Sequence, residues 1–135
     1  MNNMDRLAHK FETMRAHVPK AVVDYNPKAN VGFVAFGTSH YAVEESRDQL
    51  KSEYGIETSY LRLRAYPFAP DLLDFIHRHD RVYVIEQNRD AQMLGLMRLE
   101  YGADEIAKLR SMKYYGGLPL DARTVTDDIV RQEGK

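Results

Sequence analysis

Two short polar segments, each following an apolar run, hold the side chains of this sequence that can do chemistry. Gly37-Thr38-Ser39-His40 follows the apolar residues 31–36, and Glu86-Gln87-Asn88-Arg89-Asp90 follows the apolar residues 82–85. Hydroxyl and amide groups at a helix start, as in the first segment, can cradle an anion. The second segment gathers carboxylates, amides and a guanidinium, which suits either a ligand or the surface of another protein domain.

Each segment also has a purely structural interpretation. A hydroxyl of the first segment can simply cap the helix that follows it. Glu86 closes a buried strand, where a carboxylate is costly unless it is paired or hydrogen-bonded. Its expected partners are Arg62 and Arg64 of the preceding strand, or Arg89, in a salt-bridge network.

The usual catalytic signatures are missing from the sequence. It contains no G-x-G-x-x-G, no P-loop, no G-x-S-x-G elbow and no H-E-x-x-H, and its five histidines are scattered. It has no cysteine, which excludes disulfides, thiolate zinc sites, a cysteine nucleophile and iron–sulfur clusters ligated by this chain. An independent hydrolase is disfavoured because no nucleophile–base pair has a useful spacing.

The elements around these segments predict an α/β sandwich with a mainly parallel sheet. Apolar or alternating runs predict strands at residues 21–25, 31–36, 58–64, 82–85 and 108–113. Helical patterns between the later strands give three β-helix-β units with right-handed crossovers. Only five residues separate the first two strands, too few for a parallel crossover, so the first strand must run antiparallel to the second. Ligands bind parallel sheets outside the carboxyl ends of the strands, where both polar segments lie.

Capping residues set the expected helix limits. Gly55 is a natural stop for a helix over residues 42–53, and Pro70 opens the next helix. Asp90 and Asp121 can cap the last two helices.

Residues 1–18 are expected to form an amphipathic helix ahead of one α/β domain over residues 19–135. Apolar residues recur there at steps of three and four, and the Val18-Pro19 pair ends the pattern. The stripe consists of Met4, Leu7, Phe11, Met14 and Val18. Such a narrow stripe suits either packing on its own domain or joining to another one.

The composition is that of an ordinary globular domain. Its 135 residues are 44% hydrophobic and 29% charged, with a formal net charge of −1. That balance offers no broad electrostatic footprint for nucleic acid or a membrane surface. The N-terminus lacks the layout of a signal peptide, and no apolar run approaches the roughly 18 residues of a membrane span. We therefore expect a cytoplasmic protein.

Several segments in order resemble the C-terminal domain of the α subunit of 2-oxoacid:ferredoxin oxidoreductases, the 2-oxoglutarate type most of all. The main segments are YLRLRAYPF at 60–68, VYVIEQNRDAQ at 82–92, and KLRS at 108–111 with GLPL at 117–120. DRLAHKFET at 5–13 and VPK at 18–20 are similar to the segment that leads into that domain. The resemblance extends from about Met4 to Val130 and includes the wider pyruvate:ferredoxin oxidoreductase superfamily.

The resemblance implies a fold similar to the C-terminal domain of transketolase. This is a three-layer α/β/α sandwich with a mainly parallel five-stranded sheet and one antiparallel strand. It also implies a parent enzyme that decarboxylates a 2-oxoacid on thiamine diphosphate, passes electrons through iron–sulfur clusters to ferredoxin, and forms an acyl-coenzyme A.

No stretch of the sequence matches the family's pyrimidine-binding domain or the G-D-G motif that holds the diphosphate and its Mg. No catalytic, cofactor-binding or metal-binding residue of the family can therefore be carried onto this chain. Thiamine diphosphate, Mg and iron–sulfur clusters are expected in the parent complex, with none bound by this chain.

We therefore expect a cut-out or separately encoded structural domain, inactive alone, that packs against thiamine-binding domains or subunits of the same oxidoreductase. Ferredoxin would be an indirect partner, and an oligomer is possible. The residues expected at the interface, or at a possible ligand edge, are Thr38, Ser39, His40, Arg62, Arg64, Glu86, Gln87, Asn88, Arg89 and Gln92. Asn88→Ala or Arg89→Ala should leave the stability of the isolated domain unchanged. The alternative is a stand-alone module that binds a small anionic ligand, such as coenzyme A or a dicarboxylate, at that edge.

Overall fold

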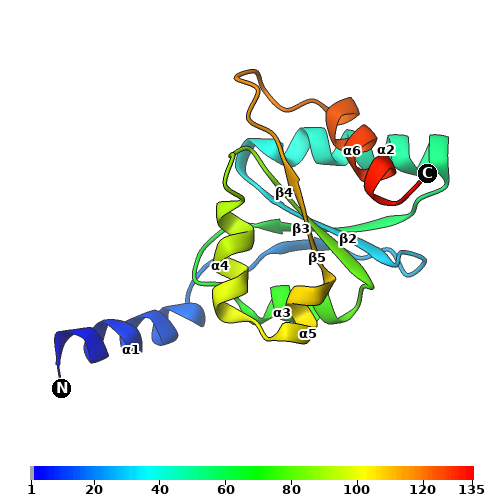
Figure 1. Cartoon of the computed structure of the whole chain (residues 1–135). Coiled ribbons are helices and arrows are strands. Elements are labelled where there is room, and N and C mark those ends of the chain that lie inside the picture. The colour runs from blue at the N-terminus through cyan, green and yellow to red at the C-terminus, as the bar shows by residue number, and fades with distance from the viewer. Residues whose placement is uncertain (1) are drawn as a thin grey trace.

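A computed structural model describes residues 2–135, with a mixed sheet between two layers of helices (Figure 1). The strands are β1 (Val22–Asp24), β2 (Val31–Phe36), β3 (Thr58–Leu63), β4 (Arg81–Glu86) and β5 (Leu109–Lys113). The helices are α1 (Asn3–Arg15), α2 (His40–Tyr54), α3 (Pro70–His77), α4 (Gln92–Glu100), α5 (Ala103–Lys108) and α6 (Ala122–Gln132), with a 3-10 turn, η1 (Gly37–Ser39), before α2.

The sheet has the strand order β1-β3-β2-β4-β5 and the predicted mixture of directions. β2 pairs in parallel with β3 and β4, and β4 pairs in parallel with β5. β1 pairs antiparallel with β3, with Val22 opposite Arg62 and Asp24 opposite Tyr60. The short connection after β1 therefore fixes its direction, as expected, while its hydrogen-bonded neighbour is β3 rather than β2.

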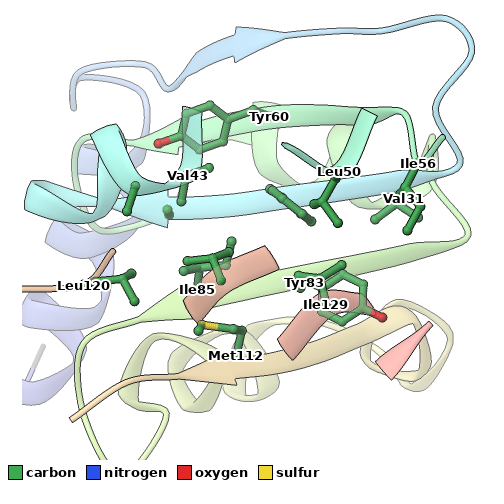
Figure 2. Packing of buried hydrophobic residues seen from close by; sticks show 14 residues of the cluster. Val31, Val43, Leu50, Ile56, Tyr60, Tyr83, Ile85, Met112, Leu120 and Ile129 are labelled. Atoms are coloured by element: carbon green, nitrogen blue, oxygen red, sulfur yellow. The ribbon is translucent and has the colours of Figure 1, made fainter. Parts of the chain in front are cut away.

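Helices cover both faces of the sheet, which confirms the three-layer α/β/α architecture. On one face α2 and α6 pack over residues that include Val31, Tyr60, Tyr83 and Ile85 (Figure 2). The opposite face carries α3 and α4, with α5 beside α3. Its buried residues include Val34, Leu61, Leu63, Phe75, Val84, Leu94 and Met97. β2 is buried along nearly its whole length because it lies at the centre of the sheet.

Most helix ends follow the capping residues. α2 ends at Gly55, whose φ of 65° is the left-handed conformation that glycine adopts easily. Pro70 occupies the first turn of α3, and the Asp121 side chain accepts a hydrogen bond from the Thr124 amide at the start of α6. The helix α5 was not expected from the sequence, because its six residues are too few to show a helical period.

The N-terminal helix α1 extends away from the α/β layers (Figure 1). It ends at Arg15, before the expected boundary at Val18-Pro19, and none of its residues is buried. Its C-terminal end is held by the Arg15 guanidinium, which donates to the Phe68 carbonyl oxygen at 2.6 Å and to Glu100 Oε2 at 2.8 Å. Within residues 2–135, no helix is both long and apolar enough to cross a membrane.

Candidate functional site

Glu86 closes the turn between β4 and α4 from the inside. Its side chain has no exposed surface, and its carboxylate accepts hydrogen bonds from the Met93 and Leu94 amides at 2.6 and 3.1 Å. Asn88 Nδ2 donates a third hydrogen bond to it at 2.9 Å. These donors satisfy the buried carboxylate, and the charge lies at the positive end of the α4 dipole. Glu86 therefore occupies the amides at the N-terminus of α4 to which an external anion would otherwise bind.

Asn88 fixes the same turn from its outer side. Its Oδ1 accepts a hydrogen bond from the Gln92 amide at 3.1 Å while its Nδ2 binds Glu86. Asn88 is thus part of the turn, contrary to the expectation that it could be truncated without cost. Ala91, the residue before α4, has a φ of 50°, an unfavourable conformation for a residue with a Cβ.

The expected partners of Glu86 were wrong. Side chains alternate along a strand, so Arg62 shares the α2 face with Tyr60, whereas Glu86 shares the α4 face with Val84. Arg64 lies beyond the end of β3 and is exposed. β2 also lies between β3 and β4, so β3 is the preceding strand in sequence but not the neighbouring strand in the sheet.

The contacts of Arg89 and Asp90, which follow in the turn, also differ from expectation. Arg89 is exposed and pairs with Asp90 at 2.7 Å rather than with Glu86. This contact with Asp90 raises the pKa of Arg89, and the nearby Tyr115 adds to the effect. Asp90 does not cap α4, because Glu86 and Asn88 bind the helix amides instead.

A hollow of about 480 Å³ lies where the ends of β2 and β4 meet. Gln87 Nε2 crosses it and donates to Ser39 Oγ at 3.0 Å and to Thr38 Oγ1 at 3.2 Å. The hydroxyls of Thr38 and Ser39 therefore bind the neighbouring loop and do not cap α2. The hollow is lined by Phe36, Gly37, Thr38, Ser39, Gln87, Asn88 and Gln92. No lysine or arginine is among these lining residues, which is poor complementarity for an anionic ligand.

His40 and Arg62 line a second, separate hollow of about 270 Å³ above β1 and β3, together with Val22, Asp24, Glu44 and Tyr60. The His40 ring stacks on the Tyr60 ring, and its Nδ1 lies 3.2 Å from the Tyr60 hydroxyl. Burial raises the pKa of Tyr60 to about 12, so this phenol stays protonated at neutral pH. Arg64 is exposed beyond the end of β3 and lines neither hollow. The ten predicted site residues thus share one edge of the sheet but do not form one cluster.

Sequence reasoning missed three large exposed side chains near this edge. Tyr41 lies in the first turn of α2, and Tyr115 and Leu118 lie in the loop that follows β5; all three are more than 60% exposed. The Tyr114 amide donates to the Glu86 carbonyl oxygen, so this loop starts beside the β4 turn. Exposed tyrosine and arginine are typical of the centres of protein interfaces. The dense run of tyrosine, glycine and leucine at residues 114–118 was the sequence signal that could have indicated an exposed contact loop.

The chemistry of these groups suits binding better than catalysis. Across residues 2–135, no group of three or more His, Asp or Glu side chains is placed to hold a metal ion. The polar side chains of the β4 turn are engaged with one another, with the hydroxyls of the η1 turn or with backbone amides. We refer to the exposed surface formed by the η1 turn, residues 87–92 and residues 114–118 as the strand-end edge.

Comparison with known proteins finds similarity both in sequence and in fold. No family model matches the chain. In sequence it is 28% identical over 100 residues to the α subunit of 2-oxoacid:ferredoxin oxidoreductase 2 from Aeropyrum pernix. This match covers 70% of the chain and 15% of the subunit, so the chain spans only a small part of that relative.

Solved structures show the same fold. A 2-oxoglutarate:ferredoxin oxidoreductase from Magnetococcus marinus, with 2-oxoglutarate, coenzyme A and succinyl-CoA bound, matches with a TM-score of 0.77 and 20% identity, over 95% of this chain and 23% of that one. The α chain of a probable 2-oxoacid ferredoxin oxidoreductase from Thermoplasma acidophilum matches at 0.53 and 22% identity, over 86% of this chain and 98% of that one. A split-gene transketolase matches at 0.62 and 16% identity, over 83% of this chain and 40% of that one. The transketolase C-terminal-like fold is confirmed, and the chain is similar to 2-oxoacid:ferredoxin oxidoreductase α subunits.

Proposed function

We propose that the chain acts as the structural C-terminal domain of the α subunit of a thiamine-dependent 2-oxoacid:ferredoxin oxidoreductase. The parent complex would carry out the oxidative decarboxylation of a 2-oxoacid to an acyl-CoA, with thiamine diphosphate, Mg and iron–sulfur clusters held outside this chain. The observation that carries the proposal is the sequence match over 100 residues to an α subunit. The match in fold over 95% of the chain to the Magnetococcus marinus enzyme supports the 2-oxoglutarate type.

The role of the domain would be to complete the subunit by packing against the thiamine-binding domains. The strand-end edge supports this role, since its exposed groups are tyrosine, arginine, leucine and amides rather than a nucleophile and a base. A module for coenzyme A or a dicarboxylate has less support. Glu86 binds the α4 amides, and no cationic side chain lines the larger hollow.

Affinity purification from cells of the source organism tests the proposal. The tagged 135-residue chain should bring down larger subunits of a thiamine enzyme, identified by mass spectrometry. The purified material should reduce viologen when 2-oxoglutarate or pyruvate and coenzyme A are added. Recovery of the chain without such subunits, together with saturable binding of coenzyme A to the isolated chain in calorimetry, would overturn the proposal in favour of the ligand-binding module.

A further inference from the structure

A hollow of about 320 Å³ lies at the edge of the sheet opposite the strand-end edge, where β2 and β4 begin. Because β1 runs antiparallel to β3, it ends at this edge and brings Tyr25 to it. The end of α3 forms the other wall. The hollow is lined by Tyr25, Asn26, Pro27, Ala29, Arg78 and His79. Its size is that of a small-molecule site.

His79, the most buried of these side chains, presents an unused hydrogen-bond acceptor. It is 3% exposed, and its Nδ1 donates to the Phe75 carbonyl oxygen at 2.7 Å. Burial lowers the pKa of His79, so the ring is neutral at neutral pH and its Nε2 carries a lone pair. Nε2 has no hydrogen-bond partner within residues 2–135. Ser111 Oγ is the one unpartnered side-chain atom fully enclosed by those residues, so the His79 Nε2 is open to the hollow that its ring lines.

Arg78 adds a positive charge that no carboxylate of residues 2–135 neutralises. The nearby Arg81 binds Glu133 at 2.7 Å, whereas Arg78 is exposed and forms no such ion pair. Its guanidinium carbon lies 4.9 Å from the centre of the Tyr25 ring. Packing on an aromatic ring leaves the N–H donors of a guanidinium free to bind a carboxylate or phosphate.

The wall opposite α3 is held in place before any ligand binds. The Asn26 Oδ1 accepts from the Lys28 amide at 3.0 Å, and the Asn26 carbonyl oxygen accepts from the Ala29 amide at 3.0 Å. The Asp80 amide donates to the Asn30 carbonyl oxygen at 2.9 Å, which joins this wall to the end of α3. A preformed hollow needs little ordering on binding, and this favours affinity for a small molecule.

The lining groups define the chemistry of a ligand. Arg78 requires an acid group. The neutral Nε2 of His79 requires an N–H or O–H donor, and a second carboxylate would be repelled there. Tyr25, Pro27 and Ala29 offer apolar surface for the body of the molecule. Inorganic phosphate satisfies only the first of these requirements.

We propose that this hollow binds a small organic acid whose apolar body also carries a hydroxyl or N–H donor. Arg78 binds the acid group, and the His79 Nε2 accepts the hydrogen bond from the donor. The site lies away from the strand-end edge, so the inference goes beyond the proposed function and does not depend on it.

An NMR titration of the full chain with two isomeric probes, 3-hydroxybenzoate and 4-hydroxybenzoate, tests the proposal. At least one of them should give saturable shifts at Tyr25, Ala29 and the Nε2 of His79. Benzoate lacks the hydroxyl and phenol lacks the acid group. Each should bind about tenfold more weakly, the loss expected for one hydrogen bond or one ion pair.

Two exposed arginines provide a matched pair of variants. Arg78 follows α3 and Arg98 lies in the last turn of α4, so both Arg78→Ala and Arg98→Ala should keep the wild-type melting temperature. Arg78→Ala should weaken binding of the better hydroxybenzoate by about tenfold, and Arg98→Ala should leave it within about twofold. His79→Asn retains a donor for the Phe75 carbonyl oxygen but removes Nε2, so it should bind the hydroxybenzoate no more tightly than benzoate.

Three results would overturn the proposal: no saturable shift with either hydroxybenzoate, equal affinity for benzoate, or equal losses in Arg78→Ala and Arg98→Ala. Saturable shifts confined to the strand-end edge would also overturn it and would favour a ligand site there. Recovery of thiamine-enzyme subunits by the chain tests the proposed function separately, so either inference can fail while the other stands.

Discussion

Single residues in the β4 turn show how a charged group can be structural although it lies where ligands usually bind. Glu86 is buried and accepts from two backbone amides and one side-chain amide. Arg89, three residues later, is exposed and pairs with its neighbour Asp90. The sequence marks both as charged residues after an apolar strand, and only the geometry separates their roles.

Replacing Glu86 should therefore be costly. Glu86→Ala leaves the Met93 and Leu94 amides without an acceptor in a dry environment, so the free energy of unfolding should fall by roughly 3 kcal/mol. Glu86→Gln keeps one acceptor oxygen and should recover about half of that loss. Urea denaturation measures both, and Arg89→Ala, expected within about 0.5 kcal/mol of wild type, is the control. Equal effects of Glu86→Ala and Arg89→Ala would contradict the structural role.

His79 predicts a pH dependence of stability. It is buried, its Nδ1 donates to the Phe75 carbonyl oxygen at 2.7 Å, and its ring contacts the Phe75 and Tyr25 rings, which also contact each other. Burial lowers its pKa below the ordinary value of 6.5, and the hydrogen bond to the Phe75 carbonyl oxygen opposes this. Lys108 and Arg78 lower the pKa further, and Asp80 raises it slightly. As the pH falls, His79 is therefore protonated in the unfolded chain before it is protonated in the folded chain.

The direction of the pH dependence follows from this difference between the pKa values of His79 in the folded and unfolded states. The stability that neutral His79 contributes is complete above about pH 6.5 and is lost as the pH falls towards the lower pKa of the folded state. Wild-type urea midpoints should fall more between about pH 7.5 and 5.5 than those of His79→Gln, which cannot titrate. Parallel pH profiles for the two proteins would show that folding does not lower the pKa of His79.

At the scale of elements, the sequence predicted the directions of strands and the ends of helices better than it predicted which strands are neighbours in the sheet and which face a side chain lies on. The antiparallel first strand followed from a short connection, and Gly55, Pro70 and Asp121 marked three helix ends correctly. The partners of Glu86 were wrong because strand order is a tertiary property that sequence order does not give. The α4 cap was missed because Glu86 reaches it from the preceding strand, outside the usual capping position.

Close packing between β2 and α3 gives a prediction at this scale. A Cβ added at Gly32 would lie 2.6 Å from Phe75 Cε1 and 3.2 Å from the His79 ring, and both side chains are buried. Gly32→Ala should therefore lower the free energy of unfolding by about 1–3 kcal/mol, because the core must shift to admit the methyl group.

Gly95 provides the matched control. It lies inside α4, and a Cβ there would meet nothing within 4 Å. Gly95→Ala should raise the free energy of unfolding by about 0.5–1 kcal/mol through helix propensity alone. Thermal or urea denaturation of the two variants should give opposite signs, and a neutral or stabilising Gly32→Ala would show that this packing is loose.

At the scale of the whole molecule, several exposed side chains with no role in the core gather where the parallel strands end. Tyr41, Tyr115 and the Gln87–Arg89 segment lie there, whereas the apolar stripe of α1 belongs to a helix held by Arg15 at the C-terminal end of α4. Elsewhere, several exposed charges pair locally, as in the Arg123–Glu53 ion pair between α6 and α2. An asymmetric distribution of this kind is expected for a domain that completes a larger assembly.

The isolated chain should accordingly be inactive. Supplied with thiamine diphosphate, Mg²⁺, coenzyme A and either 2-oxoglutarate or pyruvate, the pure protein should reduce viologen no faster than a protein-free control. Thiamine diphosphate should also leave the melting temperature unchanged, whereas a ligand at 100 times its dissociation constant would add about 2.7 kcal/mol of stability. The reason is local: the α4 amides are bound by Glu86, and the larger hollow has no cationic side chain for a diphosphate. Turnover that saturates with the 2-oxoacid, or a rise of several degrees with thiamine diphosphate, would instead require a site within these 135 residues.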